Sequence, residues 1–390
     1  GDIPSPQYEM SHTTYEGEHF EDVFPLDYYY MDLDGIWEDA DGNGIFDHHY
    51  GDISPEIWIG RLYASTLSDD EIKLLRKYFN KNHLYRTGAL TTPHRALIFY
   101  DTDGHGQEKI ETYTRYAEVI AYIVNRMLYQ QCLLVSDPEM TCAKIYIDKI
   151  REGWSMVYVF AHGNYDGNYF ILHGGWDPVC SSDIRNINPK ALFYIFVSCL
   201  TARYICTDYL AGWYVFSNYG LLVIGSTKIG MDIGNEYIFF SKLSRNTCFG
   251  EALMSSISDA ISNYLLNPEE YDWIPWCTYG LTIIGDPTLH VVNNGADGDG
   301  DCLADWFEVE NGLDPSNPDC DGDGLDDYVE LVVYETNPLK VDSDDDGLSD
   351  PVEVELGTDP LDSDTDDDGL SDSEEVRIGT DVNNADSDYD

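Results

Sequence analysis

The last quarter of this 390-residue chain repeats one acidic motif at an almost fixed interval. Four full copies of the pattern Asp-x-Asp-x-Asp-Gly-Leu-x-Asp-x-x-Glu begin at Asp297, Asp319, Asp342 and Asp364, and a fifth begins at Asp386. Successive copies start 22 or 23 residues apart. A unit this short cannot bury a core alone and becomes stable only by stacking on its neighbours. Residues 295–390 are therefore predicted to form a tandem array, separate from a domain at 1–294.

Within each copy, oxygen ligands fall at the intervals that a calcium-binding loop requires. Carboxylates occupy positions 1, 3, 5 and 9, glycine makes the turn at 6, leucine offers its carbonyl at 7, and glutamate closes the shell at 12. A hard, flexible, seven-coordinate calcium ion accepts this order, whereas magnesium requires a smaller octahedron. The predicted ligands are Asp297, Asp299, Asp301, Leu303, Asp305 and Glu308; Asp319, Asp321, Asp323, Leu325, Asp327 and Glu330; Asp342, Asp344, Asp346, Leu348, Asp350 and Glu353; and Asp364, Asp366, Asp368, Leu370, Asp372 and Glu375. Four or more calcium ions are expected.

The alternative interpretation of this segment is a solvated acidic tail. From Asp297 onward the chain has 34 acidic residues and two basic ones, a net charge of −32. A disordered tail would have no reason to keep leucine and glutamate at fixed offsets in four copies, with glycine at the turn in three of them. The array resembles the type 3 repeats of thrombospondins and similar loops on archaeal and bacterial surface proteins, which implies calcium binding.

Cysteine usage indicates an oxidising compartment, because nine cysteines are many for a cytosolic protein. Cys302 replaces the turn glycine of the first copy, at a position that favours left-handed backbone. We expect bridges between Cys302 and Cys320 and between Cys132 and Cys142, with Cys199 free; the pairing of the other four stays open. Millimolar calcium outside cells suits the loops, so an extracellular or cell-surface location is predicted.

The overall charge restricts the possible partners. With 21 basic and 73 acidic side chains the formal charge is −52, which opposes binding to nucleic acid or to anionic lipid. No apolar run is long enough to span a bilayer.

Short apolar runs alternate with amphipathic stretches in the first 294 residues. This alternation predicts an α/β fold with a mostly parallel sheet flanked by helices. The predicted strands are Ile57 to Leu62, Ala96 to Tyr100, Met156 to Ala161, Leu192 to Ser198, Leu221 to Gly225 and Leu281 to Gly285, and two of the predicted helices are Ser68 to Asn82 and Gly250 to Leu266.

Two predicted strands end in residues that can carry chemistry. One ends at His162-Gly163 and the other at Ser198-Cys199. A neighbouring imidazole can activate a thiol and then protonate a leaving amine, while the N–H groups of Gly163 and Cys199 could hold an oxyanion. The alternative is a buried apolar thiol and a core imidazole, both of which are common.

An ordered set of motifs resembles the gingipain-type cysteine peptidases, relatives of caspases and legumains, over nearly all of Gly1 to Val292. The motifs are Asp27 to Trp37, Pro55-Glu56 with Gly60-Arg61, Ala161-His162-Gly163, Ser198 to Ala202, Gly225-Ser226-Thr227, Gly250-Glu251-Ala252 and Gly285-Asp286-Pro287. The resemblance implies a caspase-like fold and a catalytic dyad of His162 and Cys199. It also implies an acid that orients the histidine, for which Asp101 is the first candidate and Asp103 the second.

The family carries an acidic turn after its Asp-Leu-Asp-Gly segment, and here that turn fits a further calcium loop. Asp39, Asp41, Asn43, Gly44, Ile45 and Asp47 match positions 1, 3, 5, 6, 7 and 9. Position 12 is Tyr50, so Asp52 or a water would have to close the shell. The alternative is an Asp/Gly turn without metal.

The functional expectation is an extracellular, calcium-stabilised cysteine endopeptidase with a calcium-binding repeat stalk, acting on peptide or protein substrates. The alternative is a catalytically silent surface protein or filament subunit whose partners are copies of itself. The family's copies of this region follow a strand ending in Gly-Asp, and Gly1-Asp2 opens this chain. We therefore expect the sheet's first strand to lie outside the sequence.

Overall fold

The computed structural model describes residues 5–13, 19–102, 110–129, 131–230, 233–268, 271, 273–291 and 298–385. The chain divides into two compact units, Gly1–Tyr78 with Thr92–Val292 and Phe79–Thr91 with Asn293–Asp390. Residues 79–91 belong with the C-terminal segment because its backbone bonds to them: Thr91 N–H donates to the Cys302 carbonyl at 2.8 Å, and Ala304 N–H donates to the Ala89 carbonyl at 2.7 Å.

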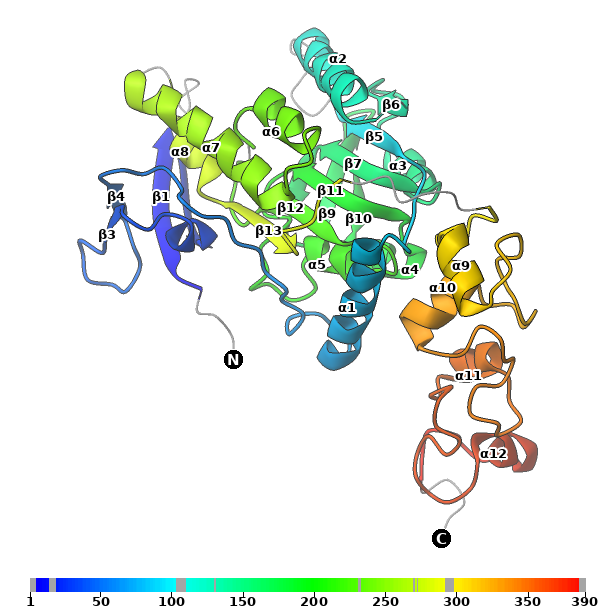
Figure 1. The fold of residues 1–390 in the computed structure, drawn as a ribbon. Helices are drawn as coiled ribbons and strands as arrows, with labels where there is room; N and C mark the ends of the chain where they lie inside the picture. The colour runs from blue at the N-terminus through cyan, green and yellow to red at the C-terminus, as the bar shows by residue number, and fades with distance from the viewer. Residues whose placement is uncertain are drawn as a thin grey trace. The chain divides into compact units, whose positions relative to one another are not determined.

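A six-stranded sheet forms the centre of the first unit (Figure 1). Its strands are β5 (Arg95–Tyr100), β6 (Gln131–Val135), β7 (Trp154–Phe160), β11 (Ala191–Val197), β12 (Leu222–Ser226) and β13 (Leu281–Gly285). The spatial order is β13-β12-β11-β7-β5-β6, and every pair is parallel except β12 with β13. The predicted α/β fold with a mostly parallel sheet is confirmed.

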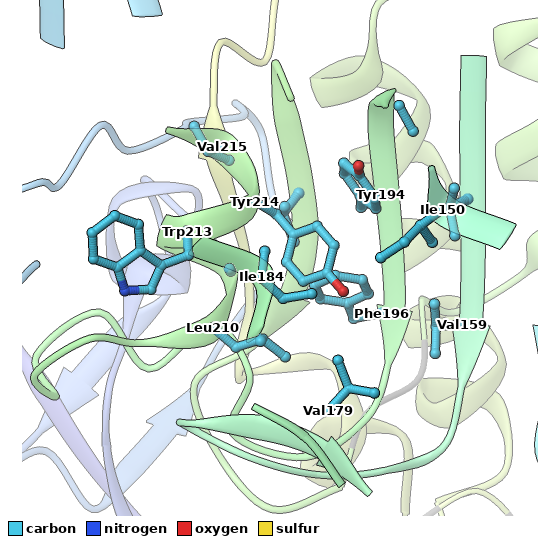
Figure 2. Close-up of a cluster of buried hydrophobic side chains, with 14 of the residues drawn as sticks. Ile150, Val159, Val179, Ile184, Tyr194, Phe196, Leu210, Trp213, Tyr214 and Val215 are labelled. Atoms are coloured by element: carbon cyan, nitrogen blue, oxygen red, sulfur yellow. The ribbon is translucent and has the colours of Figure 1, made fainter. Parts of the chain in front are cut away.

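Alternate residues of these strands supply one face of the hydrophobic core. Val159 of β7 and Phe196 of β11 face side chains from α3 (Ala143–Ile150), α4 (Ser181–Ile187) and α5 (Leu210–Val215), as Figure 2 shows. A buried hydrogen bond of 2.8 Å joins the hydroxyls of Tyr146 and Tyr214 within this layer. Strands covered on both faces have no solvated side, which explains their continuous apolar sequence.

The opposite face of the sheet packs against α2 (Ile110–Met127), α6 (Glu236–Leu243) and α7 (Phe249–Leu266), drawn above the sheet in Figure 1. Ring centroids lie 6.4 Å apart for Tyr158 and Phe240 and 4.5 Å apart for Phe193 and Phe249. The predicted helix at Gly250 to Leu266 corresponds to α7, and the one at Ser68 to Asn82 corresponds to α1 (Glu71–Thr87).

One predicted strand is wrong. Residues Ile57 to Leu62 form no strand and make only an isolated parallel bridge between Arg61 and Ile284. Arg61, within this run, explains the wrong prediction. Its side chain does not face solvent but is buried in an ion pair with Asp27 at 2.6 Å. Hydroxyls of Tyr204 and Thr282 also donate to Asp27. The buried carboxylate of Asp27 is therefore paired with Arg61 and hydrogen-bonded, and it joins segments that are distant in the sequence.

Smaller elements complete the first unit. The antiparallel strands β8 (His162–Asn164), β9 (Gly167–Leu172) and β10 (Gly175–Cys180) form a second sheet that continues directly from β7. Near the N-terminus lie the hairpin of β1 (Gln7–Thr13) and β2 (His19–Pro25), the 3-10 helix η1 (Asp27–Tyr30), and the pair β3 (Ile36–Glu38) and β4 (His48–Tyr50). Helix α8 (Trp273–Thr278) precedes β13.

In the second unit, each copy of the motif runs from its loop into a short helix. The helices are α9 (Asp305–Asn311), α10 (Asp327–Val329) continued by the π-helical turn η4 (Glu330–Tyr334), α11 (Asp350–Leu356) and α12 (Asp372–Ile378). Three of them end on a glycine with positive φ, at Gly312, Gly357 and Gly379. Cys302 has φ of 87°, so the expected left-handed conformation at this non-glycine position is confirmed.

All nine cysteines carry free thiols in the structure, so the expected bridges Cys302–Cys320 and Cys132–Cys142 are not formed in it. The reason is local: Cys132 lies within the paired strand β6, whereas Cys142 is the N-cap of α3. Cys320 accepts a hydrogen bond from the Asp314 N–H at 3.2 Å.

Among the described residues, no helix combines the length and the apolar content needed to cross a bilayer.

Candidate active site and calcium-binding loops

The parallel pairing of β7 and β11 carries His162 and Cys199 to the same edge of the sheet. Phe160 pairs with Val197, so each candidate lies two residues beyond a paired position. A further bond of 3.3 Å, from the Ala161 N–H to the Val197 carbonyl, keeps the chains together past the strand ends. The carboxyl edge of a parallel sheet is where catalytic groups collect in α/β folds.

The backbone segment after β7, at Gly163, lies very close to the segment after β11, at Ser198 and Cys199. A Cβ added to Gly163 would lie 2.5 Å from the Cys199 carbonyl oxygen and 2.9 Å from the Ser198 Cβ, so only glycine fits there. The buried Ser198 hydroxyl donates to Asn168 of β9 at 3.0 Å, which holds this segment from the other side. The predicted oxyanion residues, Gly163 and Cys199, are therefore adjacent; their role stays a prediction.

The surroundings of the Cys199 thiol come from a loop that sequence reasoning missed. The Gly230 N–H donates to Cys199 Sγ at 3.2 Å. Lys228 is fully buried, donates to the carbonyls of Ile229 and Trp276, and its Nζ lies 3.6 Å from the Trp276 ring centroid. Burial lowers the pKa of Lys228 to about 8, although Cys199 among other groups acts to raise it. In the sequence, the motif Gly225-Ser226-Thr227 pointed to this loop only as part of the family resemblance and did not predict its contact with Cys199.

His162 is half-buried in β8 beside an exposed aromatic side chain. Its ring meets that of Trp176 edge to face, with centroids 5.2 Å apart and an interplanar angle of 90°. Trp176 of β10 is 61% exposed. This arrangement leaves an exposed aromatic surface next to the imidazole.

Asp101 follows β5 and is 1% exposed. Its N–H donates to the Phe160 carbonyl at 2.8 Å, and its Oδ2 accepts from the Ile171 N–H at 3.0 Å. Ile171 lies two residues from Tyr169, the strand partner of His162. Asp101 is thus fixed beside the sheet that carries His162, and its orienting role stays a prediction. Asp103, the second candidate, lies outside the described residues.

The repeat loops share one scheme of hydrogen bonds from backbone N–H groups to carboxylates. In the second copy Asp319 accepts from positions 4 and 6, Asp321 from position 5, Asp323 from position 7, and Asp327 from position 2, at 2.7 to 3.1 Å. The third copy repeats all five bonds. The carboxylates at positions 3 and 5 thereby use Oδ1 on the backbone of their own loop, which leaves Oδ2 of Asp321, Asp323 and Asp344 for a cation, while Oδ2 of Asp346 accepts from the Ser373 N–H.

Buried oxygens in these loops lack hydrogen-bond donors in the part of the chain that the structure describes. They include Oδ2 of Asp321, Asp323, Asp327, Asp344 and Asp366, Oε2 of Glu330, and both carboxylate oxygens of Glu353 and Glu375. Groups of ligand oxygens within 4.8 Å include Asp319 with Asp321 and Asp323, and Asp342 with Asp344 and Asp346. Uncompensated buried carboxylates are costly, and a bound cation removes that cost. The donor set therefore fits calcium.

Burial and mutual repulsion act on the closing glutamates. Burial, with the neighbours Asp321 and Asp323, raises the pKa of Glu330 to about 8. Burial, with Asp344 and Asp346, does the same for Glu353. In the first copy Asp299, Asp301 and Glu308 form a comparable group, while Asp297 lies outside the described residues. The fifth copy, from Asp386, also lies outside them.

The acidic turn of the first unit repeats the same hydrogen-bond scheme. Asp39 accepts from Gly42 and Gly44, Asp41 from Asn43, Asn43 from Ile45, and Asp47 from Ala40, all at 2.8 to 3.1 Å. These are the same five position pairs as in the second and third copies. Tyr50 at position 12 offers no carboxylate. A surface hollow instead brings Glu9 and Glu21 of the hairpin to Asp41 and Asp47, a neighbourhood that sequence spacing did not reveal.

Comparison with known families matches both parts of the chain. The profile of peptidase family C25 matches residues 3–292. The profile of the bacterial thrombospondin type 3 repeat matches residues 319–341, 342–363 and 364–385. No curated protein sequence matches the chain.

Solved structures show a distant similarity to the same group of enzymes. The crystal structure of the Arg-specific cysteine proteinase gingipain R has 17% sequence identity and a TM-score of 0.48, covering 70% of this chain and 61% of that one. A complex of the pro- and mature domains of the Porphyromonas gingivalis enzyme has 16% identity and a TM-score of 0.45, covering 70% and 62%. A secreted C11 cysteine protease from Bacteroides thetaiotaomicron, in complex with an irreversible peptide inhibitor, has 12% identity and a TM-score of 0.33, covering 44% and 60%. The chain thus spans about 61% of the length of the gingipain that it matches.

Proposed function

The chain belongs to peptidase family C25, whose profile covers residues 3–292, and from this premise we propose that it is a cysteine endopeptidase acting through Cys199 and His162. The observation that carries the proposal is the close backbone contact at Gly163. This residue follows His162, and it lies so near to Cys199 that there is no room for a Cβ. An activated thiol needs this proximity between nucleophile and base.

In the proposed mechanism each of these groups has one role. His162 takes the proton from Cys199 Sγ, and the thiolate attacks the carbonyl carbon of the scissile peptide. N–H groups of Gly163 and Cys199 stabilise the oxyanion that forms, and the imidazolium returns its proton to the leaving amine. Water then hydrolyses the thioester with His162 as base. The Gly230 N–H, 3.2 Å from Sγ, favours the thiolate before attack.

The direct test is incubation of the calcium-loaded protein, in reducing buffer, with a mixed peptide library and with a peptidyl electrophile that acylates thiolates. We expect cleavage of some peptides and labelling at Cys199, located by mass spectrometry. A protein that neither cuts nor labels at Cys199 contradicts the peptidase proposal. The alternative of a silent surface protein or filament subunit, assembled from copies of this chain, would then replace it.

Replacement of Gly163 by alanine tests the geometry of the dyad. The added Cβ would meet the backbone of Cys199 at 2.5 Å, so the two strand ends must separate. A displacement of about 1 Å costs about 100-fold in turnover. Peptide cleavage should fall by that factor while the far-ultraviolet circular dichroism stays unchanged.

Gly175→Ala is the matched control for this substitution. It lies in the same small sheet, and its added Cβ would be 3.7 Å from the Leu172 carbonyl oxygen, an ordinary contact. Its turnover should stay near that of the parent protein. Equal turnover for Gly163→Ala and the parent would refute the proposed arrangement.

The repeats are proposed to bind calcium, one ion in each of the four full copies. The donorless buried oxygens of Glu330, Glu353 and Glu375 support this, together with the shared loop scheme. Calcium would supply the positive charge that holds each loop's carboxylates and leucine carbonyl together. Outside cells the ion is abundant enough to fill such loops, so we place the protein outside the cell or on its surface, with the array as a stalk.

A further ion is proposed for the loop from Asp39 to Asp47, held by Asp39, Asp41, Asn43, the Ile45 carbonyl and Asp47. The five hydrogen bonds shared with the repeats support this, and Glu9 or Glu21 can supply the carboxylate that Tyr50 lacks. Asp39→Ala should reduce the bound calcium by one ion per chain, as counted by atomic spectroscopy after dialysis. Asp148→Ala, on the exposed surface of α3, should leave the count unchanged. Unchanged calcium in Asp39→Ala would show that this turn holds no metal.

A further inference from the structure

We propose that the position-9 aspartate of a repeat ligates the calcium ion of the preceding repeat, so that Asp350 of the third copy completes the site formed by Asp323 and Glu330 of the second. This inference rests on the proposed calcium binding and adds a ligand that the spacing within one copy does not supply. It makes each ion a link between neighbouring repeats as well as the centre of its own loop.

Distances and burial support one shared shell. Asp323, Glu330 and Asp350 each offer a carboxylate oxygen, and these oxygens all lie within 4.8 Å of one another. Ligands of one calcium ion stand about 2.3–2.6 Å from it, so two of them are at most about 5 Å apart. Glu330 and Asp350 are fully buried. Water is therefore excluded from much of the space that these oxygens share.

The second copy's own position-9 residue, Asp327, uses one oxygen to hold its loop and leaves the other buried without a donor. Asp327 Oδ1 accepts from the Cys320 N–H at 2.8 Å, which braces its own loop. Asp350 braces the third loop in the same way, with Oδ1 on the Ser343 N–H at 2.7 Å and Oδ2 on the Ser343 hydroxyl at 2.8 Å. Each carboxylate oxygen has a second lone pair. Asp350 can thus brace its loop and still ligate the ion of the copy before it.

Both basic side chains in the described part of the array, residues 298–385, lie beside carboxylates outside this group. Oε2 of Glu330 and Oδ2 of Asp323 are buried without a hydrogen-bond donor. The array contains two basic residues. Lys340 pairs with Asp345 at 2.9 Å, and Arg377 lies 4.0 Å from Glu374. Three converging carboxylates, two of which keep a buried oxygen without a donor, are stabilised by a bound positive ion.

The next pair of copies repeats the arrangement. Both oxygens of Glu353 are buried without a donor. Asp372 braces its own loop through Thr365, as Asp350 does through Ser343. Ser373 donates from its N–H to Asp346 Oδ2 at 2.8 Å, which brings the start of the fourth helix onto the third loop. The third and fourth copies are therefore also in direct contact through a position-5 aspartate.

The structural test is a crystal structure of the full chain grown with calcium, with the ions located by anomalous scattering. We expect an Asp350 oxygen at about 2.3–2.6 Å from the ion of the second copy. An ion in that copy whose shell is closed by water, with Asp350 outside it, overturns the inference. A parent protein that binds no calcium in the repeats overturns the proposed calcium function, and the inference with it.

A double-mutant cycle gives a second readout, which distinguishes the proposed role of Asp350 from a role confined to hydrogen bonds within its own loop. In calcium titrations by calorimetry, Asp350→Asn should weaken one ion by about 10-fold or more. Glu330→Gln removes the second copy's closing ligand, so the two losses should be strongly non-additive in the double variant. Asp345→Asn, which removes a charge from an exposed non-ligand in the same loop, is the matched control and should change affinity little. Additive losses with Glu330→Gln, combined with non-additive losses with Glu353→Gln, would show that Asp350 serves only its own loop.

Discussion

Chelation of calcium will unfold the repeat unit and leave it open to proteolysis. Carboxylate oxygens of the half-buried Asp323 and the buried Glu330 and Asp350 lie within 4.8 Å of one another. At that separation two unit charges repel by about 3 kcal/mol when the effective dielectric constant is about 20. Each copy repeats such a group, so the folded array has little to oppose this repulsion once the ions leave.

The magnitude follows from linkage. One ion present at about 100 times its dissociation constant stabilises the folded state by about 2.7 kcal/mol. Four such ions contribute about 11 kcal/mol, as much as the whole stability of an ordinary domain, about 5–15 kcal/mol. A short helix such as α11, with seven residues, is marginal without the packing that the ions maintain.

The measurement is limited proteolysis with circular dichroism, in calcium and after addition of excess chelator. New cleavage sites should appear between residues 298 and 385 in chelator and disappear when calcium is restored. Magnesium at the same concentration should restore little protection, because it demands a smaller and more regular shell. Unchanged cleavage and unchanged dichroism in chelator would show that the array does not depend on metal.

Much of this molecule could be predicted from its sequence because the decisive signals are local. A fully buried parallel strand appears in the sequence as a continuous apolar run. This pattern predicted β7 and β11, and with them the positions of His162 and Cys199 after their ends. Their adjacency followed from parallel pairing. The motif likewise gave the ligands within each repeat, because a loop of twelve residues is specified by its own spacing.

What the sequence did not reveal depends on contacts between distant segments. The Gly230 N–H reaches Cys199 through the path of a loop 31 residues further along, and no periodicity encodes that path. The run at Ile57 to Leu62 has the composition of a strand, yet Arg61 in its middle is needed for the buried pair with Asp27. Asp350 approaches Glu330 only because adjacent copies stack, which is a property of packing between repeats.

The second large effect is expected at the nucleophile, where Cys199→Ala should reduce turnover by at least about 10⁴-fold. Cys199 is the proposed nucleophile, so the covalent route through its thioester is lost with the sulfur. The fold should survive, since Cys199 is half-buried and loss of a single sulfur at such a site costs about 1 kcal/mol. Steady-state cleavage of a peptide that the parent cuts, alongside thermal unfolding of both proteins, measures the two quantities.

His162→Ala should be nearly as damaging, because the thiol and the imidazole act as one unit and their losses do not add. The double variant should therefore be no slower than Cys199→Ala alone. Cys206→Ala is the matched thiol control: burial raises the pKa of the half-buried Cys206 thiol, so it is a poor nucleophile, and its removal should leave turnover unchanged. Full activity in Cys199→Ala, or equal losses in Cys199→Ala and Cys206→Ala, would assign the chemistry to another residue. Retained labelling of Cys199 in His162→Ala, at the parent's rate, would instead remove His162 as the base and leave the Gly230 N–H and the neighbouring Lys228 as the groups that hold the thiolate.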